Sequence, residues 1–149
     1  MNNNINNTKQ LQIRQQNVNK SLMAVLDLLN SALPEKFDII TIQEPYIDFL
    51  GNARANPKWY TVYPKTYYSD KERCIQSMIL VNKKIATDAW SIINIRSPDI
   101  TAIKLKTPTR AVLIINLYCD CSHSKSINKL NQYKCDATQD GITDMILYG

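Results

Sequence analysis

Two stretches of the sequence end on a polar side chain that could help to bind a cation. The stretch "LQIRQQN" (residues 11–17) alternates apolar and polar residues and ends on Asn17. The stretch "DIITIQE" (38–44) is nearly continuously apolar and ends on Glu44, directly before Pro45. A carboxylate and a carboxamide supply oxygen ligands for Mg²⁺, which commonly takes one or two protein carboxylates and fills its other positions with water and phosphate oxygens. These residue types therefore fit a site for Mg²⁺ and a phosphate.

A second interpretation of the same residues needs no metal. Asn and Asp side chains most often serve turns, so Asn17 could satisfy a turn, and Glu44 could cap a loop amide. Both interpretations stay open on the residues alone.

The elements around these residues predict where they lie. Residues 11–17 and 38–44 read as strands, and between them apolar residues at spacings of three and four predict a helix over residues 21–32 with Ser21 as its cap. The helical face is Leu22, Val25, Leu26, Leu29 and Leu33. A strand–helix–strand unit favours two parallel neighbouring strands, which would bring Asn17 and Glu44 to one edge of a sheet. Pro45 is expected to hold Glu44 in an extended conformation and to end its strand.

The rest of the chain predicts a sheet-rich α/β fold. A short strand is expected in "WYTVYP", and a meander of four more in "CIQSMILVN", "SIINIRS", "DITAIKLKT" and "RAVLIINLY". "SINKLNQY" has weak helical character, and "DMILYG" reads as the start of a buried strand. The central strands of a mixed sheet are expected to include Ile13 and Ile40.

Composition narrows the class of protein. Of the 149 residues 44% are hydrophobic, which predicts a packed core, and residues 1–10 read as a disordered, Asn-rich tail. The net charge of +5 is compatible with a phosphate-rich partner such as DNA. No apolar run approaches the roughly 20 residues of a membrane span, and the start lacks a secretory pattern. The sequence thus predicts an intracellular protein of the nucleus or cytoplasm, with no membrane partner.

Two other groups of residues could do chemistry, and each has a more ordinary interpretation. The stretch "CDCSH" brings Cys119, Cys121 and His123 together, with Cys135 further on. Paired zinc ligands are usually separated by two or more residues, so free thiols are favoured over a zinc site. The stretches Lys58–Tyr60 and Lys65–Tyr68 could stack on nucleic-acid bases, but aromatic residues in strands more often serve packing.

The ordered set "QQNVNKS", "DIITIQEPY", "MILVN" and "VLIINLYCD" resembles the endonuclease/exonuclease/phosphatase superfamily. The sequence most resembles the endonuclease domain of LINE-type (non-LTR) retrotransposons, as found in fungal reverse-transcriptase polyproteins. The resemblance covers residues 11–149. It implies a four-layered α/β sandwich, with two packed mixed β-sheets and helices outside, and hydrolysis of DNA phosphodiesters that depends on Mg²⁺ or Mn²⁺. By the same resemblance Asn17 orders metal and phosphate, Glu44 binds the metal, and Tyr118 supports the scissile phosphate.

The sequence also departs from the family pattern. The family continues with Gly-Asp-Phe-Asn and a later Ser-Asp-His motif, whereas this sequence stops at Gly149. The resemblance therefore implies the N-terminal part of the domain, truncated after its last strand and inactive in DNA cleavage by itself. Two alternatives remain: a non-enzymatic, degenerate remnant of such an element, and a phosphoesterase of the same superfamily that acts on another phosphate ester.

Overall fold

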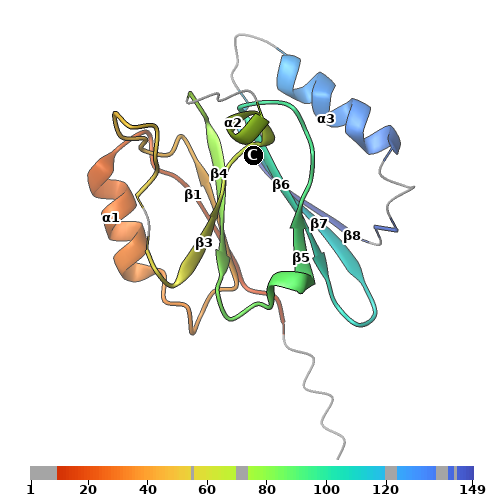
Figure 1. Cartoon of the computed structure of the whole chain (residues 1–149), viewed down its shortest axis with the longest axis horizontal. Helices are drawn as coiled ribbons and strands as arrows, with labels where there is room; N and C mark the ends of the chain where they lie inside the picture. The colour runs from red at the N-terminus through yellow and green to blue at the C-terminus, as the bar shows by residue number, and fades with distance from the viewer. Residues whose placement is uncertain (1–9, 55, 70–73, 120–123, 137–140, 143) are drawn as a thin grey trace, which may run out of the picture.

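The computed structural model describes residues 10–54, 56–69, 74–119, 124–136, 141–142 and 144–149. These residues form two four-stranded sheets packed face to face, with a helix on each outer face (Figure 1). The strand order is β1-β2-β4-β3 in the first sheet and β5-β6-β7-β8 in the second. The four-layered α/β sandwich expected from the resemblance is confirmed.

The elements have the following bounds. The first sheet contains β1 (Ile13–Asn17), β2 (Ile39–Gln43), β3 (Trp59–Val62) and β4 (Ser77–Asn82). The second contains β5 (Trp90–Ile92), β6 (Ile100–Lys106), β7 (Ala111–Leu117) and β8 (Asp144–Tyr148). The helices are α1 (Leu22–Ser31), α2 (Lys65–Ser69), the short 3₁₀ helix η1 (Thr87–Ala89) and α3 (Lys125–Asp136).

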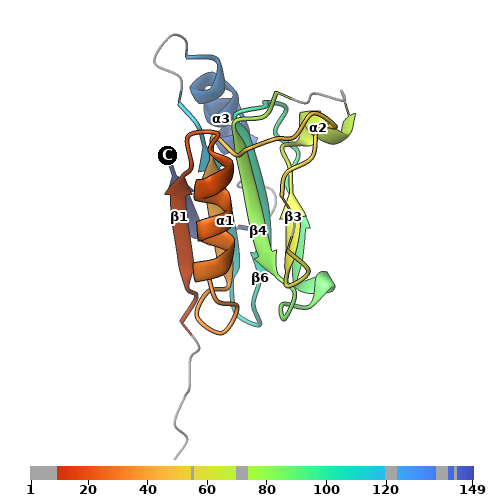
Figure 2. The same cartoon turned by 90° about the vertical axis from the view of Figure 1, so that its left-hand side faces the viewer.

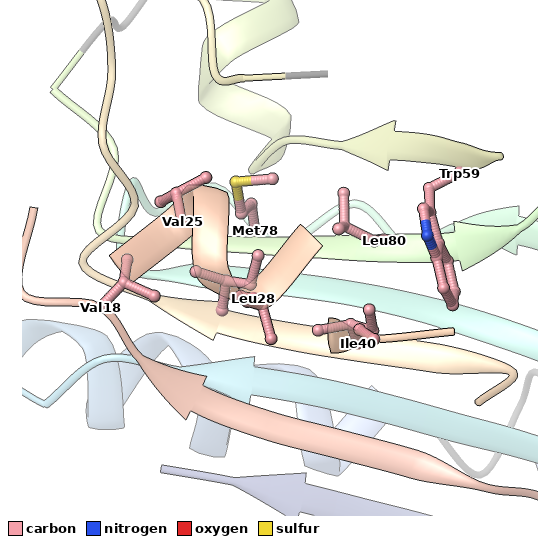
Figure 3. Packing of buried hydrophobic residues seen from close by; sticks show 9 residues of the cluster. Val18, Val25, Leu28, Ile40, Trp59, Met78 and Leu80 are labelled. Carbon is pink, nitrogen blue, oxygen red and sulfur yellow. The ribbon is translucent and has the colours of Figure 1, made fainter. Parts of the chain in front are cut away.

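Three apolar clusters fill the three interfaces between the layers. The outer face of the first sheet packs against α1 through residues such as Val25, Leu28 and Ile40 (Figure 3). Ile79 and Ile114 belong to the cluster that joins the two sheets. On the outer face of the second sheet, Leu130 of α3 completes a third cluster. Burial of apolar surface at three parallel interfaces is the main favourable free energy that holds the layers together.

The strand–helix–strand unit is confirmed. Strands β1 and β2 are parallel, with Asn17 opposite Gln43, and α1 lies over the first sheet (Figure 2). The hydroxyl of Ser21 accepts a hydrogen bond from the Ala24 N–H, which is the predicted N-cap. Within the described part of the chain, no helix has the length and apolar character needed to cross a membrane.

Two expectations about this unit were wrong. Strand β1 is an edge strand, so Ile13 does not lie in a central strand; the central strands are β2 and β4. The buried face of α1 is Val25, Leu28 and the capping Ala32, whereas Leu26 and Leu33 are exposed. The cause is the rotation of the helix on the sheet, because the sequence allows two overlapping apolar stripes and packing selects one of them.

The prediction of a four-stranded meander was wrong in part. Strand β4 pairs with β2 and β3 in the first sheet, and only β5, β6 and β7 run antiparallel in succession. Strand β8 pairs with β7 in parallel at the edge of the second sheet, with Met145 and Leu147 exposed, so it is not a buried strand. Residues 65–68, expected in a loop or strand, belong to α2. The expected disordered tail lies almost wholly outside the described residues.

Candidate functional site

Asn17 and Glu44 meet at the carboxyl ends of β1 and β2. The Asn17 Nδ2 donates a hydrogen bond of 3.1 Å to Glu44 Oε1, and Asn17 Oδ1 accepts one of 2.8 Å from the Asn19 N–H. These two bonds fix the orientation of the carboxamide, whose nitrogen therefore faces the carboxylate. The bond from the Asn19 N–H is the turn role that the sequence offered for Asn17, and the role of Asn17 in a metal site stays a prediction.

The backbone of Glu44 is not extended, contrary to the expectation drawn from Pro45. Its φ is 49°, in the left-handed region that residues other than glycine seldom adopt. Asn19 and Lys20 also have positive φ, of 50° and 56°. Hydrogen bonds hold these segments together, since the Lys20 N–H donates to the Glu44 carbonyl at 2.7 Å. Such backbone strain persists where the surroundings impose it, and it tends to gather at functional sites.

This left-handed residue explains how the two side chains meet. Ile13 packs toward the interface between the sheets, whereas Ile40 and Ile42 pack toward α1. Strict alternation along each strand would therefore send Asn17 and Glu44 to opposite faces of the first sheet. The positive φ ends that alternation at Glu44, and its carboxylate turns back to Asn17.

The chemistry of this pair suits a hard cation. Glu44 Oε2 accepts no hydrogen bond from the described residues, and Glu44 is only partly buried, so the oxygen is available to a ligand. Among the described residues there is no group of three or more His, Cys, Asp or Glu that could bind a metal by itself. A single carboxylate is within the one or two that Mg²⁺ commonly takes from a protein, and Asn17 orients that carboxylate through its Nδ2.

Tyr118 lies at the same rim, where β7 ends. Its N–H donates to the carbonyl of Asp99, and the Gln76 N–H donates to the carbonyl of Pro98. Gln76 in turn accepts from the Glu44 N–H at 2.9 Å through its backbone carbonyl. These backbone bonds join the ends of the two sheets, from Glu44 on the first to Tyr118 on the second. The structure thus brings Asn17 and Glu44 into contact and places Tyr118 on the same rim.

Buried polar side chains fix the two sheets to each other next to this rim. The Asn116 Nδ2 donates to the carbonyls of Ile42 and Met78, at 2.7 and 3.0 Å. The Gln43 Nε2 donates to the carbonyl of Leu117 at 3.0 Å. These bonds set the carboxyl end of β7 against that of β2, so they determine where Tyr118 lies relative to Glu44.

The start of α3 brings cations to the Tyr118 side of the rim. The buried carboxylate of Asp99 accepts a hydrogen bond of 2.5 Å from the Ser126 hydroxyl, which fixes the first turn of the helix. A pocket of about 380 Å³ forms there, with Tyr118 and three cationic residues, Arg96, Lys125 and Lys129, in its lining. The lining thus has three cationic side chains and one carboxylate, that of Asp99, which is already bonded to Ser126, so the pocket attracts anions.

Sequence reasoning missed Gln43, Gln76 and Asn116 as residues that build the rim. A signal existed for two of them, because Gln43 and Asn116 are polar residues within otherwise apolar strands, and a buried polar side chain needs a partner. No comparable signal marked Gln76. Cys74 and Cys119 are exposed, and neither belongs to a disulfide between described residues. Cys121 and His123 lie outside the described residues, as does the side chain of Cys135.

A tyrosine cluster lies behind the loop that follows Glu44. The rings of Tyr63 and Tyr67 stack with their centroids 3.9 Å apart, and Tyr68 packs edge-on against both. The Tyr63 hydroxyl accepts from the Ala53 N–H, and the Tyr67 hydroxyl donates to Asn52 Oδ1. Burial is the largest cause that raises the pKa of Tyr63 and of Tyr68 above the ordinary value of 10.0.

We expect this cluster to make the fold sensitive to alkali. Since the pKa values of Tyr63 and Tyr68 are raised in the folded chain, their contribution to stability is fully present below pH 10.0 and is lost as the pH rises through the higher folded values. Titration of phenolate absorbance in the folded chain should show a late phase. The double variant Tyr63→Phe, Tyr68→Phe should lose that phase. Titration of all the tyrosines in one phase in the unaltered chain would contradict the prediction.

Three solved structures share this fold. The endonuclease domain of TRAS1, a telomere-specific non-LTR retrotransposon, is 17% identical with a TM-score of 0.66, over 93% of this chain and 57% of that one. An endonuclease/exonuclease/phosphatase family protein from Leptotrichia buccalis is 12% identical with a TM-score of 0.54, over 91% of this chain and 66% of that one. D. rerio TDP2, complexed with a single-strand DNA product, is 12% identical with a TM-score of 0.52, over 92% of this chain and 58% of that one.

No family model and no curated protein sequence matches the chain. The structural likenesses show that the chain has the endonuclease/exonuclease/phosphatase fold. The chain spans between 57% and 66% of the length of these three proteins.

Proposed function

We propose that this chain is an endonuclease-type domain, like that of a non-LTR retrotransposon, and that it binds a divalent cation and a DNA phosphodiester at the rim. The hydrogen bond between Asn17 and Glu44 is the main support for this proposal. It holds the Glu44 carboxylate, with one oxygen available to a ligand, at the edge where the parallel strands β1 and β2 end. The fold shared with the TRAS1 endonuclease domain supports the choice of DNA. The net charge of +5 supports it as well.

Each rim residue has a distinct role in this proposal. The Glu44 carboxylate binds Mg²⁺ or Mn²⁺, and Asn17 orients that carboxylate and faces the phosphate. Tyr118 donates its phenolic proton in a hydrogen bond to a phosphate oxygen, and the cations of the adjacent pocket attract the flanking backbone. A bound divalent ion supplies positive charge that neutralises the phosphate and stabilises charge on the oxygens that react.

Binding and cleavage are expected to differ in this chain. Hydrolysis also needs a positioned nucleophile and a group that takes its proton, and loss of a general base costs about 10²–10⁴ in rate. None of the described residues at the rim is a histidine, and the single histidine of the sequence, His123, lies outside them. We therefore propose that the 149-residue chain binds DNA and nicks it slowly at best.

The test is the binding of a labelled DNA duplex in Mg²⁺ and in EDTA. We expect Mg²⁺ to strengthen binding and Tyr118→Phe to weaken the Mg²⁺-dependent binding about 10–100-fold, the range for a hydrogen bond to a charged group. Tyr60→Phe is the matched control, since Tyr60 lies at the opposite end of the first sheet beside Lys83. Equal binding in Mg²⁺ and EDTA, or equal losses in the two variants, would exclude this site as the place of binding.

A further inference from the structure

The loop after Glu44 presents an aromatic side chain to solvent from a rigid hairpin. Ile47 and Ala53 form an antiparallel bridge that closes the hairpin. Within it, Asp48 Oδ1 accepts hydrogen bonds from the N–H groups of Leu50 and Asn52, both at 2.9 Å. At its tip the side chain of Phe49 is 96% exposed. A loop tip held by this many bonds presents Phe49 in a fixed place.

The tyrosine cluster holds this hairpin from behind. The Tyr67 hydroxyl of α2 donates to Asn52, and the hydroxyl of Tyr63, which directly follows β3, accepts from the Ala53 N–H. Both residues at the closing end of the hairpin are therefore anchored. Full exposure of a large apolar side chain brings no folding stability, since its apolar surface stays in water. A rigid base beneath an exposed ring therefore indicates a ligand for the ring.

The space beside Phe49 shares lining residues with the cationic pocket. A pocket of about 520 Å³ is lined by Phe49, Leu50, Tyr46 and Pro45, with Lys20 and Asp48 as its charged residues. Asp48 is engaged in the hairpin, so Lys20 is the charge that remains for a ligand. Cys74 and Gln76 line both this pocket and the cationic one. An apolar pocket and a cationic pocket thus meet at Gln76, whose backbone carbonyl accepts from the Glu44 N–H.

We propose that the apolar pocket receives an unpaired nucleobase of the bound strand, stacked on Phe49. The inference rests on the proposed function, since the phosphates of the same strand lie at the rim and in the cationic pocket. Every base has a π-face, so an aromatic ring beside a positive backbone track is the usual way to bind single strands without reading their sequence. Lys20, the single cation in the lining of the pocket, fits the phosphate that flanks the stacked base.

The experiment compares two single-stranded probes of equal length and charge. One is a labelled oligonucleotide of twelve thymidines, and the other has the same backbone with abasic sites in place of the bases. Affinities are measured by fluorescence anisotropy in Mg²⁺ and in EDTA. The variants are Phe49→Ala, Phe49→Trp and the control Met23→Ala, an exposed apolar residue on α1 that is 66% exposed. Surface changes of this kind leave the fold intact.

We expect Phe49→Ala to weaken binding of the thymidine probe about 5–100-fold and to leave the abasic probe unchanged, because stacking contributes that much per base. Phe49→Trp should keep the affinity, and Met23→Ala should change neither probe. Equal effects of Phe49→Ala on both probes, or on neither, would overturn the inference and leave Phe49 to a partner of another kind. Failure of the proposed function would give a different result from failure of this inference. Binding of the abasic probe to the unaltered chain would then be the same in Mg²⁺ and in EDTA.

Discussion

Replacing Asn116 with leucine is expected to lower the free energy of unfolding by about 2–4 kcal/mol, because two buried carbonyls lose a donor and each unsatisfied buried group costs about 1–3 kcal/mol. The Asn116 Nδ2 donates to the carbonyls of Ile42 and Met78 across the interface between the sheets. Leucine keeps most of the volume, so the loss reports on the hydrogen bonds. Urea denaturation of the full chain measures it.

The control for this prediction is Asn128→Leu on the exposed face of α3. A surface change there should alter the free energy of unfolding by less than about 0.5 kcal/mol. If Asn116→Leu lowered the free energy of unfolding no more than the control does, the two sheets would not depend on this side chain for their contact. The placement of Tyr118 would then need another cause.

The local part of the fold could be predicted from the sequence. The alternation in residues 11–17 and the three- and four-residue spacings of α1 reflect periods that the backbone imposes, and the continuous apolar run of β2 reflects burial on both faces. The face of α1 that packs on the sheet was not predicted correctly. The cap at Ser21 follows from the same local chemistry. Parallel pairing of β1 and β2 then follows, because a helical crossover between two neighbouring strands leaves them parallel. The ends of both strands, and hence Asn17 and Glu44, were placed correctly at one edge.

The tertiary part could not be predicted in the same way. Strand β4 resembles β6 and β7 in composition, and its pairing with β2 and β3 assigns it to the first sheet. The left-handed backbone of Glu44 depends on partners far along the chain, since its N–H donates to Gln76 and its carbonyl accepts from Lys20. The periodicity of a sequence does not depend on such long-range partners. The edge of the sheet at which Glu44 lies was therefore predicted correctly, whereas its backbone conformation was predicted wrongly.

Replacing Glu44 with glutamine is expected to weaken Mn²⁺ binding by about 100-fold or more, since even a residue that only orients a metal ligand contributes about 10–100-fold. Glu44 provides the carboxylate, and its Oε1 is held by the Asn17 Nδ2. Glutamine keeps the size of the side chain and removes its charge, and a hard cation prefers the charged oxygen ligand. Asn17→Ala, which removes the orienting bond, should weaken binding within that 10–100-fold range.

Calorimetric titration of Mn²⁺ into the full chain tests the central claim most directly, because it measures the cation site without requiring cleavage. The unaltered chain and Glu35→Gln, an equivalent change before β2 at the opposite end of the sheet, should bind one Mn²⁺ with the same affinity. Glu44→Gln should show no comparable binding. Equal affinity in Glu44→Gln and Glu35→Gln would contradict the account, because the cation would then bind elsewhere than at the rim formed by Asn17 and Glu44.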